Sequence, residues 1–450
     1  MAERSWVRRV ASRGRRWLAA RALGAYELLA GQGAVTRQAS PSRSLEARRK
    51  TTQDDARALP QLPSMPAAAK VFEGVTPQSL HLAGLRHGDA QPVVSLVVPA
   101  IRPDSIFAGV ATALQVGRLL ALALDRPLRV VPFGRAEPEQ LAAALTAFLA
   151  VDGHPVPPLS VVPQRQLAHT TVSSDDVWVV TYWTTAHAAD VACRVGVLDP
   201  ARVVYLVQDY EPGFHAWSVA HALTRQTYRA GFTHVVNSSS LARYLVEREG
   251  DGTDHGLVFA PHLDLDRLAQ VASRREPSQP VRVFFYGRPG KPRNLFELGV
   301  AALRAASVTL AAEGIAWQAV SAGEEHPDIE LPTGQTVRSL GTVDWDAYYD
   351  LLAATDVGLS LMHSPHPSHP PLEVAVSGGL AVTNDLDGSR SHFHDRVTAV
   401  APDPDALAAA LVDAVRCAAH EGPQPFAPPV EGRLGRPLHE VVDDLARRLR

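Results

Sequence analysis

Cysteine and lysine are scarce in this sequence. Its 450 residues include two cysteines, Cys193 and Cys417, and only three of its 44 basic side chains are lysines. Two cysteines cannot build a disulfide framework or a cysteine-based zinc module, and their number fits a reducing cytoplasm. No window approaches the roughly 18 uninterrupted apolar residues of a membrane-spanning helix, and the N-terminus lacks the short apolar core of a secretory signal. We therefore expect neither a transmembrane nor an exported protein.

A strong overall charge is also lacking, because 44 basic and 47 acidic side chains leave a formal charge of −3. This mean conceals an asymmetry: residues 1–50 hold twelve Arg or Lys against three Glu, a balance of +9, so residues 51–450 carry −12. An acidic body argues against a nucleic-acid partner, because such binding depends on neutralising phosphates with a basic surface. At about 100–200 residues per domain, the length predicts two or three domains.

The basic N-terminal segment has the pattern of an amphipathic helix. On a helical wheel, Trp6 and Trp17 lie on an apolar side, and most of the arginines between Arg4 and Arg16 lie on the other. Two interpretations remain open: residues 1–30 bind an anionic membrane surface, or they pack on the protein's own body or form a disordered tail. The segment from residue 31 to about 85 has no sustained period, and we interpret it as a linker.

From Val93 onward, short apolar runs alternate with helical stretches, which is typical of βα units around a parallel sheet buried on both faces. The polar stretch SRREPSQP at residues 273–280 interrupts this alternation. We therefore predict an α/β protein with a tail and linker over residues 1–85 and two Rossmann-like, doubly wound domains over 86–275 and 276–450. The last helix, from about residue 439, follows a Pro-rich stretch and can return to the first domain. A ligand shared by two such domains belongs in the cleft between them.

The segment from Leu361 to Asn384 reads LMHSPHPSHPPLEVAVSGGLAVTN. A predicted strand ends in a His/Pro/Ser loop, Pro371 suits the first turn of a helix, and Glu373 lies inside that turn. Free amides at a helix start can accept phosphate, and a carboxylate beside them can accept both hydroxyls of a ribose. In the alternative interpretation, Glu373 only complements the helix dipole, and the following glycines end the helix.

Two further segments place charged side chains after predicted strands. In FFYGRPGKPRN, the cations Arg288, Lys291 and Arg293 follow a buried strand, which favours an anionic ligand unless the loop is simply solvated. In VYLVQDYEPGFHAWS, Asp209 and Glu211 precede Phe214, His215 and Trp217. Carboxylates and aromatic rings suit a polar substrate such as a sugar, whereas the alternative is a capped helix with a Trp in the core.

Together, the motifs QDYEPGFH, FYGRPGKPRNLFEL and SPHPSHPPLEVAVSGG followed by VTN resemble those of a GT-B glycosyltransferase of family 4, and more narrowly of the WsaF-like rhamnosyltransferases of bacterial cell-surface polysaccharide assembly. The resemblance extends from about Val93 to Ala418. It implies two Rossmann-like domains, with the nucleotide-sugar donor held mainly by the second and the acceptor by the first. It also implies retaining transfer of L-rhamnose from dTDP-L-rhamnose to a glycan or lipid-linked glycan. We expect the protein in the cytoplasm, at the inner face of the plasma membrane if residues 1–30 bind there.

The resemblance assigns the donor site residue by residue. Glu373 matches the ribose-binding glutamate, which is the second of a Glu-x7-Glu pair, but the first position is Pro365, so sugar contacts fall to the loop Ser364–His369. Arg288 and Arg293 match the basic pair at the diphosphate, with Lys291 as a competitor. The donor-binding candidates are Gly109, Gly287, Arg288, Lys291, Arg293, Leu340, Gly341, Ser368, His369, Pro371, Leu372 and Glu373.

The catalytic candidates are Asp209, Glu211 and Arg288. Asp209 aligns with the aspartate of a His-Asp pair in which Gln208 replaces the histidine, and we expect it to orient or deprotonate the acceptor hydroxyl. Arg288 would neutralise the leaving diphosphate. We expect no cofactor and no metal, although Asp209 and Glu211 imitate an acidic metal-binding pair. Two alternatives stay open: another nucleotide sugar, linked to UDP or GDP, and a non-catalytic membrane-associated scaffold that binds glycan or nucleotide.

Overall fold

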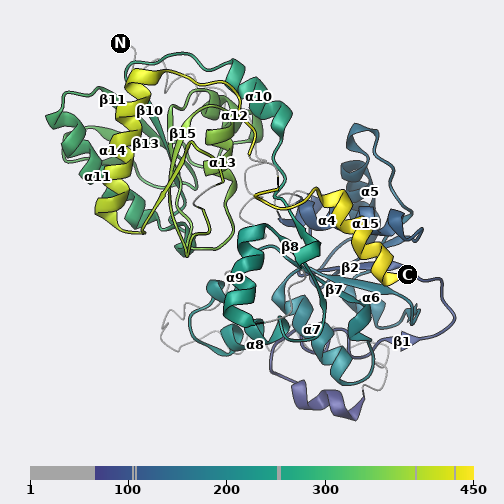
Figure 1. Cartoon of the computed structure of the whole chain (residues 1–450). Helices are drawn as coiled ribbons and strands as arrows, with labels where there is room; N and C mark the ends of the chain where they lie inside the picture. Colours follow the sequence, from purple (N-terminus) through teal and green to yellow (C-terminus); the bar gives the residue numbers. More distant parts are fainter. Residues whose placement is uncertain (1–65, 104–105, 107–108, 251–254, 391–392, 430–431) are drawn as a thin grey trace, which may run out of the picture. The chain divides into compact units, whose positions relative to one another are not determined.

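The computed structural model describes residues 66–450 except for 104–105, 107–108, 251–254, 391–392 and 430–431. The predicted amphipathic helix of residues 1–30 and most of the predicted linker lie outside the described residues. Among the described residues, two seven-stranded sheets and one two-stranded sheet form (Figure 1). The small sheet pairs β1 (Arg86–His87) with β5 (Thr171–Val172) in parallel. The predicted α/β class with two doubly wound sheets is confirmed.

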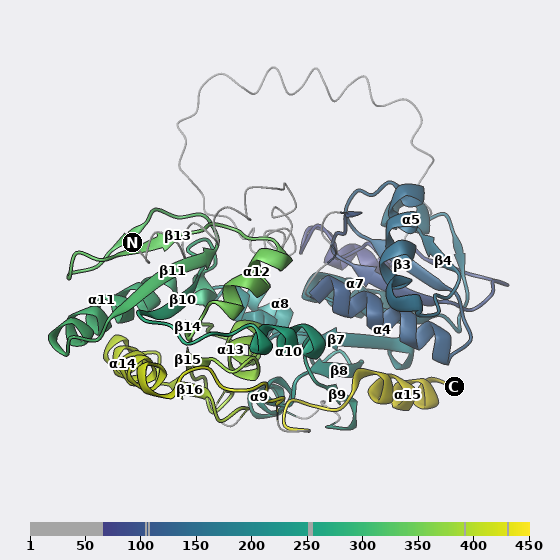
Figure 2. The same cartoon turned by 90° about the horizontal axis from the view of Figure 1, so that it is seen from above.

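The first large sheet has the strand order β4-β3-β2-β6-β7-β8-β9. All residues of its central strands β2, β3, β6 and β7 are buried, which explains why these segments are continuously apolar. Helix α4 packs on β2 and β3, and α5 packs on β4 (Figure 2). The strands are β2 (Val94–Val98), β3 (Leu128–Pro132), β4 (Leu159–Val161), β6 (Val177–Val180), β7 (Val203–Val207), β8 (Thr233–Asn237) and β9 (Val258–Phe259).

Helices and short 3-10 turns connect the strands of this part of the chain. They are η2 (Ala67–Phe72), α4 (Gly109–Ala123), α5 (Pro138–Leu149), η4 (Val151–Gly153), α6 (Gln164–Leu167), α7 (Trp183–Arg194), η5 (Pro200–Arg202), η6 (Glu211–Phe214), α8 (Val219–Thr227), α9 (Ser239–Glu249), η7 (His255–Leu257) and α10 (Leu265–Ser273).

The second large sheet has the order β12-β13-β11-β10-β14-β15-β16, and its strands are parallel except for the edge strand β12. Helices α11 and α14 pack on one face, and α10, α12 and α13 pack on the other (Figure 1). The elements are β10 (Val281–Gly287), η8 (Pro292–Asn294), α11 (Phe296–Ala312), β11 (Trp317–Gly323), β12 (Ile329–Glu330), β13 (Thr336–Ser339), α12 (Trp345–Ala353), β14 (Val357–Leu359), α13 (His369–Val376), β15 (Leu380–Asn384), β16 (Val397–Val400), α14 (Pro404–Glu421) and α15 (Leu438–Leu449).

The sequence did not predict the short edge strands β4, β12 and β16, nor the helix α10. The edge strands are only partly buried, so their apolar signal is weak. Helix α10 spans nine residues and ends at Ser273, directly where the polar stretch begins. Its roughly two and a half turns are too few for a clear helical period to appear beside that polar composition.

The contacts divide the described chain into two compact units. One contains Val207–Gly213 and His234–Asp444, and the other contains residues 66–206, Phe214–Thr233 and Leu445–Arg450. In the second unit, the Arg202 Nη1 donates to the Leu449 carbonyl at 2.7 Å, and the Arg450 Nη2 donates to the Ala123 carbonyl at 2.7 Å. The end of α15 is therefore tied to η5 and to the end of α4. The predicted domain boundary at residues 275 and 276 stays a prediction.

One helical stretch among the described residues, Pro292–Ala312, is long and apolar enough to cross a membrane by length and composition. It comprises η8 and α11. The buried side of α11, including Leu303 and Leu310, packs with Leu407 and Leu411 of α14 in the core of the second sheet. A helix that packs both on a sheet and against a neighbouring helix has apolar residues for this packing.

Candidate functional site

The predicted donor residues follow the carboxyl ends of neighbouring strands in the second sheet. Arg288 comes directly after β10, and Glu373 lies in α13 after β14, which pairs with β10 in parallel. Before α13, Ser368 adopts a left-handed backbone with φ of 68°, and Leu295 before α11 does the same with φ of 49°. Such conformations are costly for residues other than glycine and cluster at functional sites. The strain therefore points to the same edge as the charged side chains.

Glu373 is buried, with 6% of its surface exposed, and its Oε2 accepts a hydrogen bond from the Tyr348 hydroxyl at 2.5 Å. Burial, with a smaller contribution from the charge of Asp264, raises the pKa of the Glu373 carboxyl to about 7 against the opposing effect of the hydrogen bond from Tyr348. The pKa of Tyr348 is raised well above its usual value, first by burial and then by Glu373. Tyr348 is therefore the donor in this pair, and the carboxyl changes its protonation near neutral pH.

The helix start before Glu373 has fewer amides than the sequence pattern suggests. Pro370 and Pro371 have no backbone N–H. The nearby amide donors are therefore those of His369 and Leu372. The Leu372 side chain is buried in a cluster with Phe393 and Leu434. A ligand can therefore use Leu372 only through its backbone.

The loop Ser364–His369, called the sugar loop below because the resemblance assigns it the sugar contacts, is anchored from two sides. The carbonyl of Pro365, at the position of the missing first glutamate, accepts a hydrogen bond from the Ser240 hydroxyl at 2.8 Å. Arg390 is almost wholly buried, with 1% exposed, and its Nη2 donates to the carbonyls of Ser364 at 2.6 Å and His366 at 3.0 Å. The guanidinium thus holds the loop backbone. Sequence reasoning missed Arg390, whose only signal was its place in the turn DGSR after a predicted strand.

His366 and His369, the two histidines of this loop, are held in the neutral form. Burial lowers the pKa of His369 to about 4, with a further contribution from His262. Burial likewise lowers the pKa of His366 well below its usual value. Their rings lie 5.7 Å apart. Among the residues that the structure describes, no three His, Cys, Asp or Glu side chains are grouped to hold a metal ion.

Arg288 is 5% exposed, and its guanidinium Nη2 lies 3.4 Å from Oε1 of Glu324, the residue after β11. Its Cζ lies 5.8 Å from the centre of the Tyr286 ring. Gly287 allows this close packing, because a Cβ there would meet the Ser321 hydroxyl at 2.2 Å. Sequence reasoning missed Glu324, although two adjacent glutamates after a predicted strand were a usable signal. Lys291 is half-buried in the turn before η8.

Asp209, Arg293 and Ser364 are brought together. Oδ1 of Asp209 accepts a hydrogen bond from the Ser364 hydroxyl, and Oδ2 lies 3.9 Å from Nη1 of Arg293. The backbone of Arg293 also accepts a hydrogen bond from the amide of His363 at 2.6 Å. Asp209 is therefore placed beside the sugar loop and one predicted diphosphate ligand. Its role towards the acceptor hydroxyl stays a prediction.

The remaining candidates lie at strand ends as well. The Leu340 amide donates to the Ser321 carbonyl at 2.7 Å, and the Gly341 carbonyl accepts from the Gly323 amide at 2.9 Å, so this turn is pinned to the end of β11. Gly109 is the first residue of α4, which follows β2. Glu211 is buried at the start of η6.

The aromatic residues after β7 differ in their exposure. Trp217 is 91% exposed, and its ring stacks on His221 with centres 5.3 Å apart. The alternative interpretation of a core Trp is therefore wrong, because the side chain precedes α8 on its solvent side. His215 is half-buried and lies edge-on to Trp183, with ring centres 5.5 Å apart.

Comparison with known families gives two matches in the predicted order. Residues 93–239 match the WsaF N-terminal domain, and residues 281–412 match the WsaF C-terminal domain. Together they cover more than half of the chain. The chain belongs to the WsaF family. This confirms the resemblance to a GT-B, WsaF-like glycosyltransferase that the three motifs indicated.

Among curated proteins, the O-antigen biosynthesis protein RfbC of Myxococcus xanthus is 38% identical over 244 residues, which are 53% of this chain and 18% of RfbC. The matched region is thus less than a fifth of that relative's length. Similar solved structures include a glycosyltransferase from Rickettsia africae, with 12% identity, 80% and 93% of the two chains covered and a TM-score of 0.46. HepE of Anabaena, in complex with UDP and glucose, has 13% identity, 80% and 95% coverage and a TM-score of 0.46.

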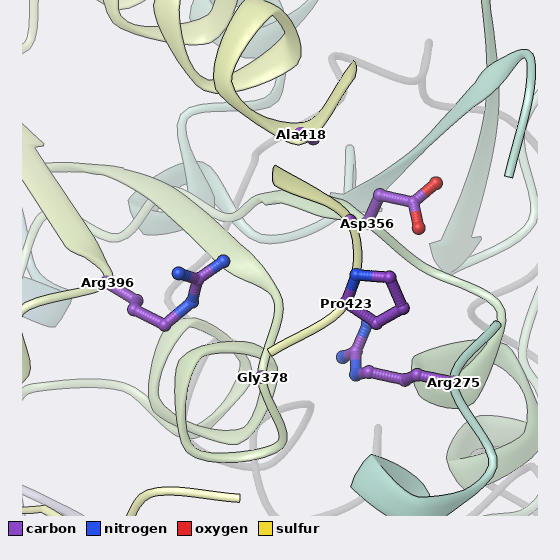
Figure 3. A pocket seen from close by; sticks show the side chains of 7 residues that line it. Arg275, Asp356, Gly378, Arg396, Ala418 and Pro423 are labelled. Carbon is purple, nitrogen blue, oxygen red and sulfur yellow. The ribbon is translucent and has the colours of Figure 1, made fainter. Parts of the chain in front are cut away.

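A pocket of this WsaF-family chain lies away from the predicted donor site. It is lined by Arg275, Asp356, Arg396 and Pro423, among others (Figure 3). Asp356 directly precedes β14, so the pocket is at the amino end of that strand. The guanidinium of Arg275 donates to the carbonyls of Ser377 and Thr355. Its hydrogen bonds therefore serve the chain itself.

Proposed function

We propose that this chain is a retaining glycosyltransferase that moves a deoxyhexose, L-rhamnose from dTDP-L-rhamnose, to a glycan or lipid-linked glycan in bacterial cell-surface polysaccharide assembly. Family membership supports the reaction class. The similarity to RfbC, an O-antigen biosynthesis protein, supports the pathway class. The motif resemblance supports the sugar and the nucleotide.

One observation carries the assignment of the donor site: Arg288 and Glu373 follow adjacent parallel strands and are linked by two tyrosines. Nη1 of Arg288 lies 3.5 Å from the Tyr286 hydroxyl, and the Tyr348 hydroxyl donates to Glu373. Both tyrosine rings lie edge-on to Phe284, with ring centres 6.4 Å and 6.3 Å apart. A cation at one strand end and a carboxylate at the next suit the two ends of a nucleoside diphosphate. The cation meets the diphosphate, and the carboxylate accepts from the sugar of the nucleoside, which in dTDP is the 3′-hydroxyl of the deoxyribose.

In the proposed reaction, the bond between the anomeric carbon and the diphosphate oxygen breaks while the acceptor oxygen bonds to that carbon. Negative charge develops on the leaving diphosphate, where Arg288 and Arg293 stabilise it. The acceptor hydroxyl loses its proton, and Asp209 orients this hydroxyl or accepts the proton. Neutral His366 and His369 suit hydrogen bonds to sugar hydroxyls. This scheme uses side chains of the protein and requires no metal.

The acceptor side includes Trp217 in this proposal. An exposed indole face provides a platform on which a sugar ring can pack, and its stacking on His221 fixes the orientation of the indole.

The chain acts on the cytoplasmic side, and residues 1–30 hold it at an anionic membrane surface. Deletion of residues 1–30 is expected to release the protein from anionic vesicles and to leave activity on a soluble acceptor intact. Equal vesicle binding by both forms would contradict the membrane role.

The decisive experiment is calorimetry of the full chain with dTDP, UDP, GDP and dTDP-L-rhamnose, each with and without a chelator. We expect a preference for the two thymidine ligands that the chelator does not change. A preference for UDP or GDP would replace the proposed donor by another nucleotide sugar. Absence of binding to every nucleotide would favour the non-catalytic scaffold instead.

A further inference from the structure

Glu324 occupies the position where two anion-binding donors converge. Its Oε1 lies 3.4 Å from Nη2 of Arg288, and its Oε2 accepts a hydrogen bond from the Gly290 amide at 2.7 Å. Both donors belong to the turn after β10, whereas Glu324 comes from the end of β11. A guanidinium and a backbone amide that point at one carboxylate are also suited to the oxygens of a phosphate.

The burial of Arg288 explains why a carboxylate is present there. A guanidinium that is 95% removed from solvent needs an opposite charge nearby, because burial of an unpaired charge is expensive. Glu324 provides that charge in the protein without ligand. Its side chain is 24% exposed, so it can rotate outwards without crossing the core. Arg288 is thus held in place by a partner that can leave.

The local backbone is shaped for this contact. Gly290 has no side chain, and a Cβ at this position would lie 2.7 Å from Oε2 of Glu324. Gly323, directly before Glu324, has φ of 142°, and a Cβ there would lie 2.8 Å from Cγ of Arg288. Two glycines therefore allow the carboxylate and the arginine stem to approach. Glu325, the next residue, has an exposed side chain and supplies a matched control.

We propose that Glu324 is a displaceable internal counter-ion that competes with the donor's diphosphate for Arg288 and the Gly290 amide. The diphosphate carries more negative charge than one carboxylate, so it displaces Glu324, whereas an uncharged nucleoside cannot. Glu324 thereby sets the donor affinity and selects ligands with a diphosphate. This inference rests on the proposed role of Arg288 at the diphosphate.

The test compares Glu324→Gln with Glu325→Gln by calorimetry against inorganic pyrophosphate, dTDP and thymidine. Glutamine has the shape of glutamate without its charge, so we expect at least about tenfold tighter binding of pyrophosphate and dTDP by Glu324→Gln, from removal of a like charge within a few ångströms of the ligand. Thymidine affinity is expected to stay unchanged. Glu325→Gln is expected to lie within about twofold of the wild-type chain, because its charge is solvated.

Unchanged or weaker pyrophosphate binding by Glu324→Gln would overturn the inference, because Glu324 would then only orient Arg288. Glu324→Ala gives a second measurement if the Gln variant does not fold, with the same expected direction. A wild-type chain that binds no nucleotide, together with a Glu324→Gln chain that binds pyrophosphate, would contradict the proposed function and support the counter-ion. If the double variant Glu324→Gln/Arg288→Ala no longer binds pyrophosphate, the pyrophosphate binding of Glu324→Gln depends on Arg288.

Discussion

Two buried arginines at opposite ends of the second sheet show how the same side chain serves different purposes. At the amino end, Arg275 donates to the carbonyls of Ser377 and Thr355 and to the Ser377 hydroxyl, which are fixed parts of the fold. At the carboxyl end, Arg288 faces the carboxylate of Glu324, which is a flexible and partly exposed side chain. An arginine with fixed acceptors stabilises a fold, whereas one with an exchangeable acceptor can bind a ligand.

The largest expected effect is on stability at the amino end. Arg275→Ala leaves buried carbonyls without a donor, and we expect a loss of about 3–5 kcal/mol in the free energy of unfolding. Chemical unfolding of both proteins measures this difference. A loss below about 1 kcal/mol would show that water replaces the guanidinium, and the contrast with Arg288 would then fail.

Arg288→Ala is expected to reduce ligand affinity strongly and stability only slightly. The affinity for dTDP should fall about 100-fold, because a charge-assisted contact to the diphosphate is lost, and the free energy of unfolding should change by less than about 1 kcal/mol. Calorimetry and chemical unfolding of the same preparation separate the two effects. Unchanged dTDP affinity would remove Arg288 from the donor site.

Glu373→Gln tests a buried side chain of the candidate donor site through the pH dependence of stability. In the folded protein, the Glu373 carboxyl keeps its proton to a pKa of about 7, whereas the unfolded chain releases it near 4.5. The unfolded state therefore binds fewer protons between these values, so this group lowers stability as the pH rises from about 4.5 to 7 and adds no further loss at higher pH. We expect Glu373→Gln to be more stable than the wild-type chain by about 3 kcal/mol at pH 8 and to be equal to it near pH 4.

The same substitution should weaken nucleotide binding. The 3′-hydroxyl of the deoxyribose donates to the ionised carboxylate, so the dTDP affinity of the wild-type chain is expected to rise as the pH increases through about 7. In Glu373→Gln this rise should be absent. Calorimetry at pH 6 and pH 8 checks both proteins, and an equal pH dependence in the two would assign the titration to another group.

Trp217→Ala is the smallest expected change in stability, within about 0.5 kcal/mol, because the side chain is 91% exposed. If the ring supports the acceptor, the KM for the acceptor should rise several-fold while the dTDP affinity stays the same. Trp217→Phe keeps an aromatic face and should recover part of the loss. An unaltered acceptor KM in Trp217→Ala would exclude this ring from acceptor binding.

The site was predictable where strand ends coincide with charged residues. Continuous apolar runs identified β10 and β14, and the residues that follow a parallel strand lie at the edge where ligands bind. Arg288 and Glu373 became donor-site candidates in this way, and their roles stay predictions. Tyr348 and Arg390 were not, because Tyr348 lies in a helix 25 residues before its partner Glu373, and Arg390 reaches back 26 residues to the Ser364 carbonyl.

The sequence by itself determined the α/β class, the alternation of elements and the family, because burial on both faces requires apolar strands and the motifs are local. Only the tertiary structure decided which partners meet. The strand order places β11 and β14 on either side of β10, and this brings Glu324 to Arg288 and the turn after β10 near the sugar loop. Local sequence does not specify strand order, since it results from packing of the whole sheet. For this reason the counter-ion of Arg288 became visible only in the fold.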